Sequence, residues 1–174
     1  MQNKRIFLIG FMGAGKTTLG KRLANKSGLP FVDVDQKIEA YFQLSIQSIF
    51  EKYGEAFFRK EESKMLEKLI EEFPQAILSV GGGLPCYNNN IELMNLSGTT
   101  CYLHRPAKEL FHRLKNSKEN RPLLTGKSDA ELLQYIEVKL LEREVFYSKA
   151  KIIVYRDQQD VSSLMKLLEL TAIV

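Results

Sequence analysis

The sequence predicts one α/β domain in which a five-stranded parallel sheet lies between two layers of helices. Apolar runs typical of strands occupy five stretches: residues 5–9, 31–34, 76–80, 100–103 and 151–155. Helical patterns separate these runs, and strands that alternate with helices form a parallel sheet covered on both faces. The chain of 174 residues is long enough for a single domain (residues 1–174) with a sizeable core, and it shows no internal repeat, low-complexity tract or linker.

Glycine and proline set the expected boundaries of the first helices. The first helix follows Gly15 and stops at Gly28, because glycine is favoured where a helix ends. An apolar stripe over residues 46–53 ends at Gly54, and the next helix, over 58–73, stops before a proline.

Two further helices flank an irregular segment. One begins at Pro106, and the other begins with a capping box formed by Ser128 and Glu131. The segment between them, residues 116–127, is polar and charged and includes Arg121. Long irregular segments inside compact domains are often lids or binding loops, and a plain surface loop is the alternative.

Composition and charge narrow the class of protein without deciding its function. No apolar run approaches the roughly 20 residues needed to span a bilayer, and the N-terminus lacks a signal-peptide pattern, so we expect a cytoplasmic protein with no membrane partner. The two cysteines, Cys86 and Cys101, form no close metal-binding pair and are expected to be reduced thiols. A net charge of +4 favours anionic partners, which could be nucleic acid or nucleotide phosphates with a carboxylate substrate.

Residues 10–17, G-F-M-G-A-G-K-T, match the phosphate-binding pattern G-x-x-x-x-G-K-[ST] between an expected strand and an expected helix. Glycines let the backbone approach phosphate oxygens, so that successive N–H groups and the helix N-terminus point at the anion. Lys16 adds a cation for the β- and γ-phosphates, and Thr17 offers a hydroxyl to Mg²⁺. We therefore expect ATP to contact Gly13, Ala14, Gly15, Lys16, Thr17 and Thr18.

Three more clusters lie where a parallel sheet would bring them together. Residues 33–35 (D-V-D) end the second strand, residues 79–83 (S-V-G-G-G) end the third, and residues 54–62 (G-E-A-F-F-R-K-E-E) open the third helix. Ligands of open α/β sheets bind at the carboxyl ends of the strands, so we expect these clusters to form the acceptor site.

Side-chain chemistry gives these clusters provisional roles. Asp35 is suited to accept a hydrogen bond from a substrate hydroxyl and to assist its deprotonation, unless it is a solvated turn carboxylate. Arg59 offers a planar fork for a carboxylate, although an arginine among helix glutamates is commonly a surface ion pair. Gly81, Gly82 and Gly83 allow close approach of a ring, or they form a simple turn after the strand.

Together with the P-loop and residues 120–124 (N-R-P-L-L), these motifs resemble the shikimate kinase family, in the same order over most of the chain. The resemblance implies a five-stranded parallel sheet of order 2-3-1-4-5, like that of nucleoside monophosphate kinases. It implies substrate-binding helices at about residues 35–62 and a lid at about 112–127. It also implies transfer of the ATP γ-phosphate to the 3-hydroxyl of shikimate, with Mg²⁺ as cofactor, in aromatic amino acid biosynthesis.

The same resemblance implies roles for residues that carry no distinctive local signal. Asp33 would hold Mg²⁺ through water, and Arg121 would contact the phosphates during transfer, so that Lys16, Asp35 and Arg121 form the catalytic set. Arg143 would help Arg59 and the three glycines to hold shikimate; its alternative is an ion pair with a neighbouring glutamate. The adenine side is less distinctive: Arg113 and Lys115 are both candidates, and Gln159 is expected there from its position.

Several other functions fit the sequence less well. A gluconate or nucleoside monophosphate kinase would share the architecture, but Arg59 in its G-E-x-x-F-R setting together with the glycines favours shikimate. A GTPase switch requires an N-K-x-D motif, which the sequence lacks. Charges are spread over mixed helix faces rather than gathered in one stripe, so nucleic acid is not an expected partner. We expect a monomer whose partners are shikimate and ATP.

Overall fold

A computed structural model describes residues 4–116 and 127–171 of the chain. Five strands form one sheet: β1 (Lys4–Ile9), β2 (Phe31–Asp33), β3 (Gln75–Ser79), β4 (Thr99–Leu103) and β5 (Ile152–Val154). All neighbouring strands are parallel, and their order is β2-β3-β1-β4-β5. The predicted fold class and strand order are confirmed.

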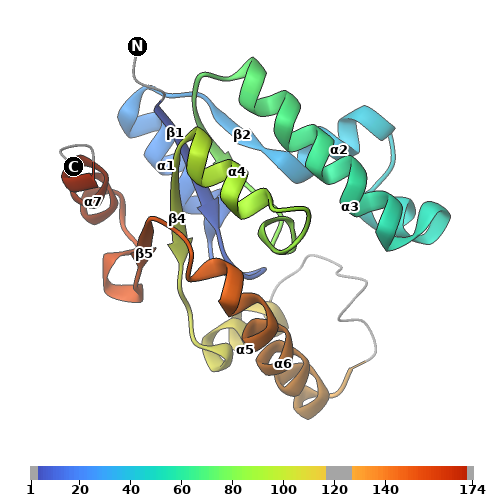
Figure 1. Cartoon of the computed structure of the whole chain (residues 1–174). Coiled ribbons are helices and arrows are strands. Elements are labelled where there is room, and N and C mark those ends of the chain that lie inside the picture. Colours follow the sequence, from blue (N-terminus) through green and yellow to red (C-terminus); the bar gives the residue numbers. More distant parts are fainter. Residues whose placement is uncertain (1–3, 117–126, 172–174) are drawn as a thin grey trace.

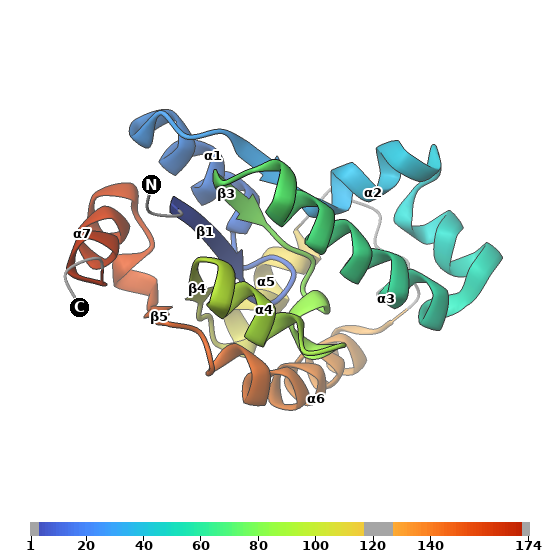
Figure 2. The same ribbon diagram turned by 45° about the horizontal axis from the view of Figure 1, so that its top comes forward.

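The helices follow the strands along the chain and lie on both sides of the sheet (Figures 1 and 2). They are α1 (Lys16–Ser27), α2 (Val34–Phe42), α3 (Ile46–Glu72), α4 (Asn90–Ser97), α5 (Ala107–Lys115), α6 (Asp129–Tyr147) and α7 (Val161–Thr171), with short 3₁₀ turns η1 (Leu84–Cys86) and η3 (Arg156–Gln158). No helix in the described part of the chain is long and apolar enough to cross a membrane.

Alternation along the strands produces two apolar cores, one on each face of the sheet. Phe7 of β1 belongs to a buried cluster with Leu66 of α3 and Met94 of α4. The next residue, Leu8, points to the opposite face and belongs to a cluster with Leu19 of α1. Helices packed on both faces hold the strands in place, so the segments that follow β1, β2 and β3 start from fixed positions at the carboxyl edge of the sheet.

Strand β2 is shorter than predicted, and this places Asp35 in a helix. The apolar run 31–34 predicted that residues 33–35 would end the strand, but β2 ends at Asp33. The carboxylate of Asp33 accepts a hydrogen bond from the backbone N–H of Gln36 at 3.4 Å and caps α2. The prediction was wrong because an apolar run does not distinguish a strand from the first turn of a buried helix.

Other local signals agree with the structure. Helix α3 is interrupted at Gly54, where φ is 81°, so the two predicted helical stretches meet there. Ser128 and Glu131 form the predicted capping box at the start of α6. The expected lid, residues 112–127, begins inside α5, which continues to Lys115. Residues 117–126, which include Arg121, lie outside the described residues.

Candidate active site

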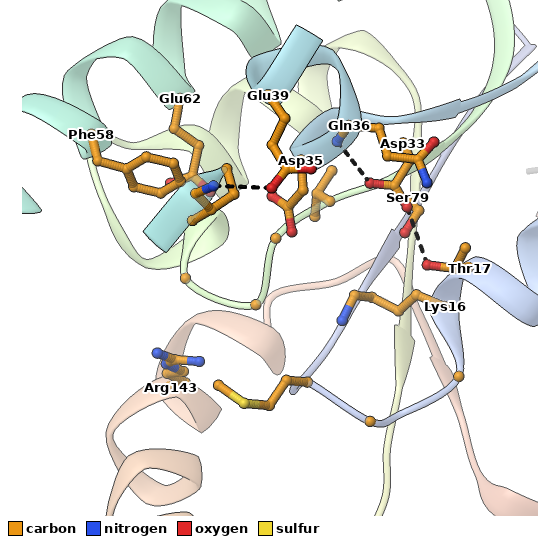
Figure 3. A pocket seen from close by; sticks show the side chains of 18 of the residues that line it. Lys16, Thr17, Asp33, Asp35, Gln36, Glu39, Phe58, Glu62, Ser79 and Arg143 are labelled. Carbon is orange, nitrogen blue, oxygen red and sulfur yellow. Dashed lines mark hydrogen bonds between the residues drawn. The ribbon is translucent and has the colours of Figure 1, made fainter. Parts of the chain in front are cut away.

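A cavity of about 820 Å³ opens at the carboxyl edge of the sheet. Its walls come from the P-loop, α2, α3, the glycine loop after β3, and α6. Figure 3 shows Asp33, Asp35 and Glu62 along one side of this cavity, with Lys16 and Arg143 on the opposite side. Segments that are far apart in the sequence thus bring acidic and basic groups into one space.

The P-loop has the backbone conformation that its glycines predict. Gly10, Gly13 and Gly15 have φ values of 136°, 80° and 102°, a region that side chains with a Cβ rarely adopt. Gly15 is the N-cap of α1, so the positive end of the helix faces the cavity. The Lys16 ammonium donates hydrogen bonds to the carbonyl oxygens of Gly10 and Phe11 at 2.8 and 3.0 Å. The loop therefore presents N–H groups and a cation to one space.

Thr17 and Asp33, the two expected Mg²⁺ residues, are neighbours. The Thr17 hydroxyl donates a hydrogen bond to Asp33 Oδ2 at 3.1 Å. Hydroxyl and carboxylate oxygens are ligands that Mg²⁺ accepts, and Mg²⁺ is usually held by one or two protein groups together with substrate phosphates. The two side chains therefore fit a Mg²⁺ ion that also binds ATP.

Asp35 lies in the first turn of α2 with its carboxylate largely withdrawn from water. Burial raises its pKa from the ordinary value of 3.8 to about 6. The nearby charge of Asp33 raises it further, whereas the cations Lys16 and Arg59 oppose the shift. A carboxylate with this pKa is ionised at neutral pH and is a stronger base than an ordinary aspartate, which suits proton transfer.

Arg59 of α3 is held in place by two glutamates and aromatic rings. Its Nε and Nη2 donate to Glu55 Oε1 at 3.2 and 3.1 Å, and its Nη1 donates to Glu62 Oε2 at 2.8 Å. The guanidinium also lies over the rings of Tyr87 and Phe58, 4.7 and 5.2 Å from their centroids. The predicted helix ion pairs are present, and Arg59 also lines the cavity, where a role in binding a carboxylate stays a prediction.

Glu62 lines the same cavity, although it was not among the site residues predicted from the sequence. Its side chain is 1% exposed, and burial raises its pKa to about 7, against the opposing charge of Arg59. A Cβ on Gly81 would lie 2.7 Å from Glu62 Oε1 and 2.8 Å from Asp35 Oδ1, so the two carboxyl groups close on a position that only glycine fits. The available signal was its place as the last residue of the G-E-x-x-F-R-x-x-E motif.

The glycine loop lies against two arginines. A Cβ on Gly83 would lie 2.6 Å from Arg59 Nη1, and a Cβ on Gly82 would lie 3.2 Å from Arg143 Nη1. The Tyr147 hydroxyl of α6 donates to the Gly82 carbonyl at 2.5 Å, which ties the loop to the helix that carries Arg143. Two guanidinium groups therefore converge on one short stretch of backbone.

A smaller cavity of about 170 Å³ adjoins the outer side of the P-loop. Its lining includes Ala14, Thr18, Arg105, Arg113 and Gln159. The P-loop therefore separates two spaces, and the expected nucleotide residues are shared between them.

The two candidates for the adenine side differ in their surroundings. Lys115 is paired with Asp129 in the first turn of α6, whereas Arg113 lines both cavities. The side-chain amide of Gln159 donates to the carbonyl oxygens of His104 and Val154 at 2.9 and 3.0 Å, so this residue also supports the end of the sheet. Arg121 lies outside the described residues.

A phosphate-binding loop between β1 and α1 of a parallel sheet in this order, facing acidic and basic side chains across one cavity, defines the class of P-loop kinases. A family model described as shikimate kinase matches residues 12–171. The chain therefore belongs to the shikimate kinase family, and the resemblance in its motifs is confirmed.

Individual relatives agree with this membership. The shikimate kinase of Parabacteroides distasonis is 44% identical over 173 residues, which is 95% of this chain and 99% of that protein. The crystal structure of shikimate kinase from Bacteroides thetaiotaomicron matches with a TM-score of 0.90 and 43% identity, covering 97% of this chain and 98% of that one. Shikimate kinase from Acinetobacter baumannii in complex with shikimate matches with a TM-score of 0.82 and 33% identity, covering 97% of this chain and 93% of that one.

A gluconokinase from Sinorhizobium meliloti shares the fold alone, since its TM-score is 0.55 and its identity 16% over 99% of this chain and 97% of that one. A gluconate kinase therefore shares the architecture of this chain, as predicted from the sequence, and the comparison shows no more than that shared fold.

Proposed function

We propose that this protein transfers the γ-phosphate of ATP to the 3-hydroxyl of shikimate, giving shikimate 3-phosphate and ADP in aromatic amino acid biosynthesis. The observation that carries the proposal is the convergence of Arg59 and Arg143 on the glycine loop, in the cavity that also contains the P-loop and Asp35. A ring with a carboxylate at one end and hydroxyls at the other matches this division of charge. The relative from Acinetobacter baumannii was crystallised with shikimate.

In the proposed complex the substrate carboxylate binds the two arginines. A guanidinium pairs with a carboxylate through parallel, charge-assisted hydrogen bonds, and such pairs are strongest where water is excluded. Because Glu55 and Glu62 already hold Arg59, little side-chain entropy is lost when the substrate binds. The backbone of Gly81–Gly83 lies beside the ring, and Asp35 accepts the hydrogen bond of the 3-hydroxyl.

Transfer then depends on positioning and on charge at the phosphates. Lys16 and the N–H groups of residues 13–18 bind the phosphate oxygens, and Asp35 takes the proton of the attacking hydroxyl. Mg²⁺, held by Thr17 and Asp33, would neutralise charge on the β- and γ-phosphates. Arg121 is assigned to the moving phosphoryl group.

Four further expectations belong to this proposal. The reaction requires Mg²⁺, so excess chelator should abolish it. The protein acts as a monomer, which light scattering after gel filtration would test. It acts in the cytoplasm, where cell fractionation should place it. On the adenine side, Arg113 and Gln159 are proposed to contact the nucleotide.

A panel of acceptors tests the proposal. ADP release from ATP should be at least about 10²-fold faster with shikimate than with gluconate, a nucleoside monophosphate or water alone. The Asp35→Asn protein is the control, because it keeps the shape of the site and lacks the base. Equal rates with every acceptor, or faster release with gluconate, would overturn the proposal.

A further inference from the structure

Arg105, in the loop between β4 and α5, contacts the P-loop from behind. Its Nε donates a hydrogen bond to the carbonyl oxygen of Ala14 at 3.1 Å, across 91 residues of sequence. The Arg105 side chain is 13% exposed, and Ala14 is buried. A buried carbonyl oxygen requires a partner, and here the partner is a charged group held in place.

The peptide that Arg105 contacts is the one that precedes the helix of the phosphate site. In a trans peptide the C=O and the following N–H point in opposite directions. When Arg105 holds the Ala14 carbonyl on the outer side of the loop, the N–H of Gly15 is turned to the inner side, where phosphate is expected. Gly15 has a φ of 102°, and glycine tolerates both orientations of this peptide, so the residue type alone does not select one.

Glu109 fixes the orientation of Arg105. Its Oε2 accepts from Arg105 Nη1 at 2.9 Å, and its Oε1 accepts from Arg156 Nη1 at 2.8 Å. Glu109 lies in the first turn of α5, and neither it nor Arg156 lines either of the two cavities. The side chain of Arg156 is 72% exposed, and exposed ion pairs contribute little.

We propose that Arg105, oriented by Glu109, is a positioning residue that keeps the Ala14–Gly15 peptide in the phosphate-binding orientation. The proposal rests on the proposed function in one respect, that the P-loop binds the phosphates of ATP. The alternative is direct contact between Arg105 and the base or ribose of the nucleotide, because Arg105 also lines the smaller cavity.

Inorganic tripolyphosphate separates these two roles, because it carries phosphates without base or ribose. Dissociation constants for ADP and for tripolyphosphate are measured by calorimetry on the native protein and on Arg105→Ala. Loss of the hydrogen bond from Arg105 to Ala14 should weaken the binding of both ligands by the same factor, about tenfold. The KM for shikimate should change by less than about twofold. Arg105→Lys keeps a donor for Ala14 and should recover part of the loss.

Glu109→Gln provides a second, milder variant that touches no proposed ligand. It should weaken both ligands by about threefold, whereas the matched control Arg156→Gln should leave both unchanged. Thermal unfolding is recorded for each variant, so that a loss of fold is recognised.

The outcomes are distinct. If Arg105→Ala weakens ADP and leaves tripolyphosphate unchanged, the residue contacts the base or ribose, and the proposal is wrong. Unchanged binding of both ligands, or equal weakening of shikimate and nucleotide, also overturns it. Failure of the native protein to bind ADP would instead refute the proposed nucleotide site itself.

Discussion

Replacing Asp35 with asparagine should stabilise the free protein at alkaline pH while it removes activity. In the folded protein the pKa of this carboxyl is about 6, against an ordinary value of 3.8. A raised carboxyl pKa means that ionisation is disfavoured in the folded state. Protonated Asp35 therefore favours the folded state, and its contribution to the free energy of unfolding is complete below about pH 4. That contribution is lost as the pH rises through about 6 and the carboxyl ionises.

The size of the effect follows from the shift. Each pKa unit corresponds to 1.36 kcal/mol, so a shift from 3.8 to about 6 corresponds to about 3 kcal/mol at pH 8. Asparagine has nearly the same shape and does not ionise, so the variant avoids this cost. For a chain of this length the gain would raise the melting temperature by about 6–12 °C. Loss of the Asp35 charge also removes one cause of the raised pKa of Glu62, which adds in the same direction.

Urea unfolding at pH 4 to 8 measures the difference directly. The free energy of unfolding of Asp35→Asn should exceed that of the native protein by little at pH 4 and by the full amount above pH 7. Asp157→Asn, at an exposed position in η3, is the control and should show no such trend. In parallel, kcat should fall by at least about 10²-fold. A variant that is less stable than the native protein at pH 8 would refute the argument that burial raises this pKa.

Three other perturbations test the site. Arg59→Ala should lower kcat/KM for shikimate by about tenfold to a hundredfold, the size expected for loss of a charge-assisted pair. It should affect far less an analogue of shikimate in which an amide replaces the carboxylate; equal losses would mean that Arg59 does not bind the carboxylate. Gly83→Ala places a Cβ 2.6 Å from Arg59 Nη1 and should raise the KM for shikimate by about tenfold with the KM for ATP unchanged; equal changes in both constants would contradict this. Asp33→Asn should raise the Mg²⁺ concentration needed for half-maximal rate, and an unaltered Mg²⁺ titration would remove Asp33 from the metal site.

The fold and the phosphate site were predictable because their signals are local. The P-loop pattern of residues 10–17 fixes a strand, a turn and a helix within one short stretch, and the capping box at Ser128 is equally local. The start of α2 was not predictable in the same way, since the run 31–34 has the composition of a strand. Helix α4 has only eight residues, too few to show a clear period.

Features that depend on burial or on distant contacts could not be predicted. Glu62 follows Arg59 by one turn, as a surface ion pair would, and only the packed structure gives it a raised pKa beside Asp35. Arg105 belongs to no motif, and its contact with Ala14 arises because β1 and β4 are neighbours in the sheet. The different surroundings of Arg113 and Lys115 likewise follow from their positions in space and not from their place in the sequence.

The central claim is that this site phosphorylates shikimate at one hydroxyl with ATP as donor. Incubation of the protein with ATP, Mg²⁺ and shikimate, followed by ³¹P and ¹H nuclear magnetic resonance, measures this directly. We predict one ADP for each shikimate 3-phosphate, with the phosphorus coupled to the proton on carbon 3 of the ring. Phosphate on another hydroxyl, or ADP formed with free phosphate and unaltered shikimate, would contradict the account.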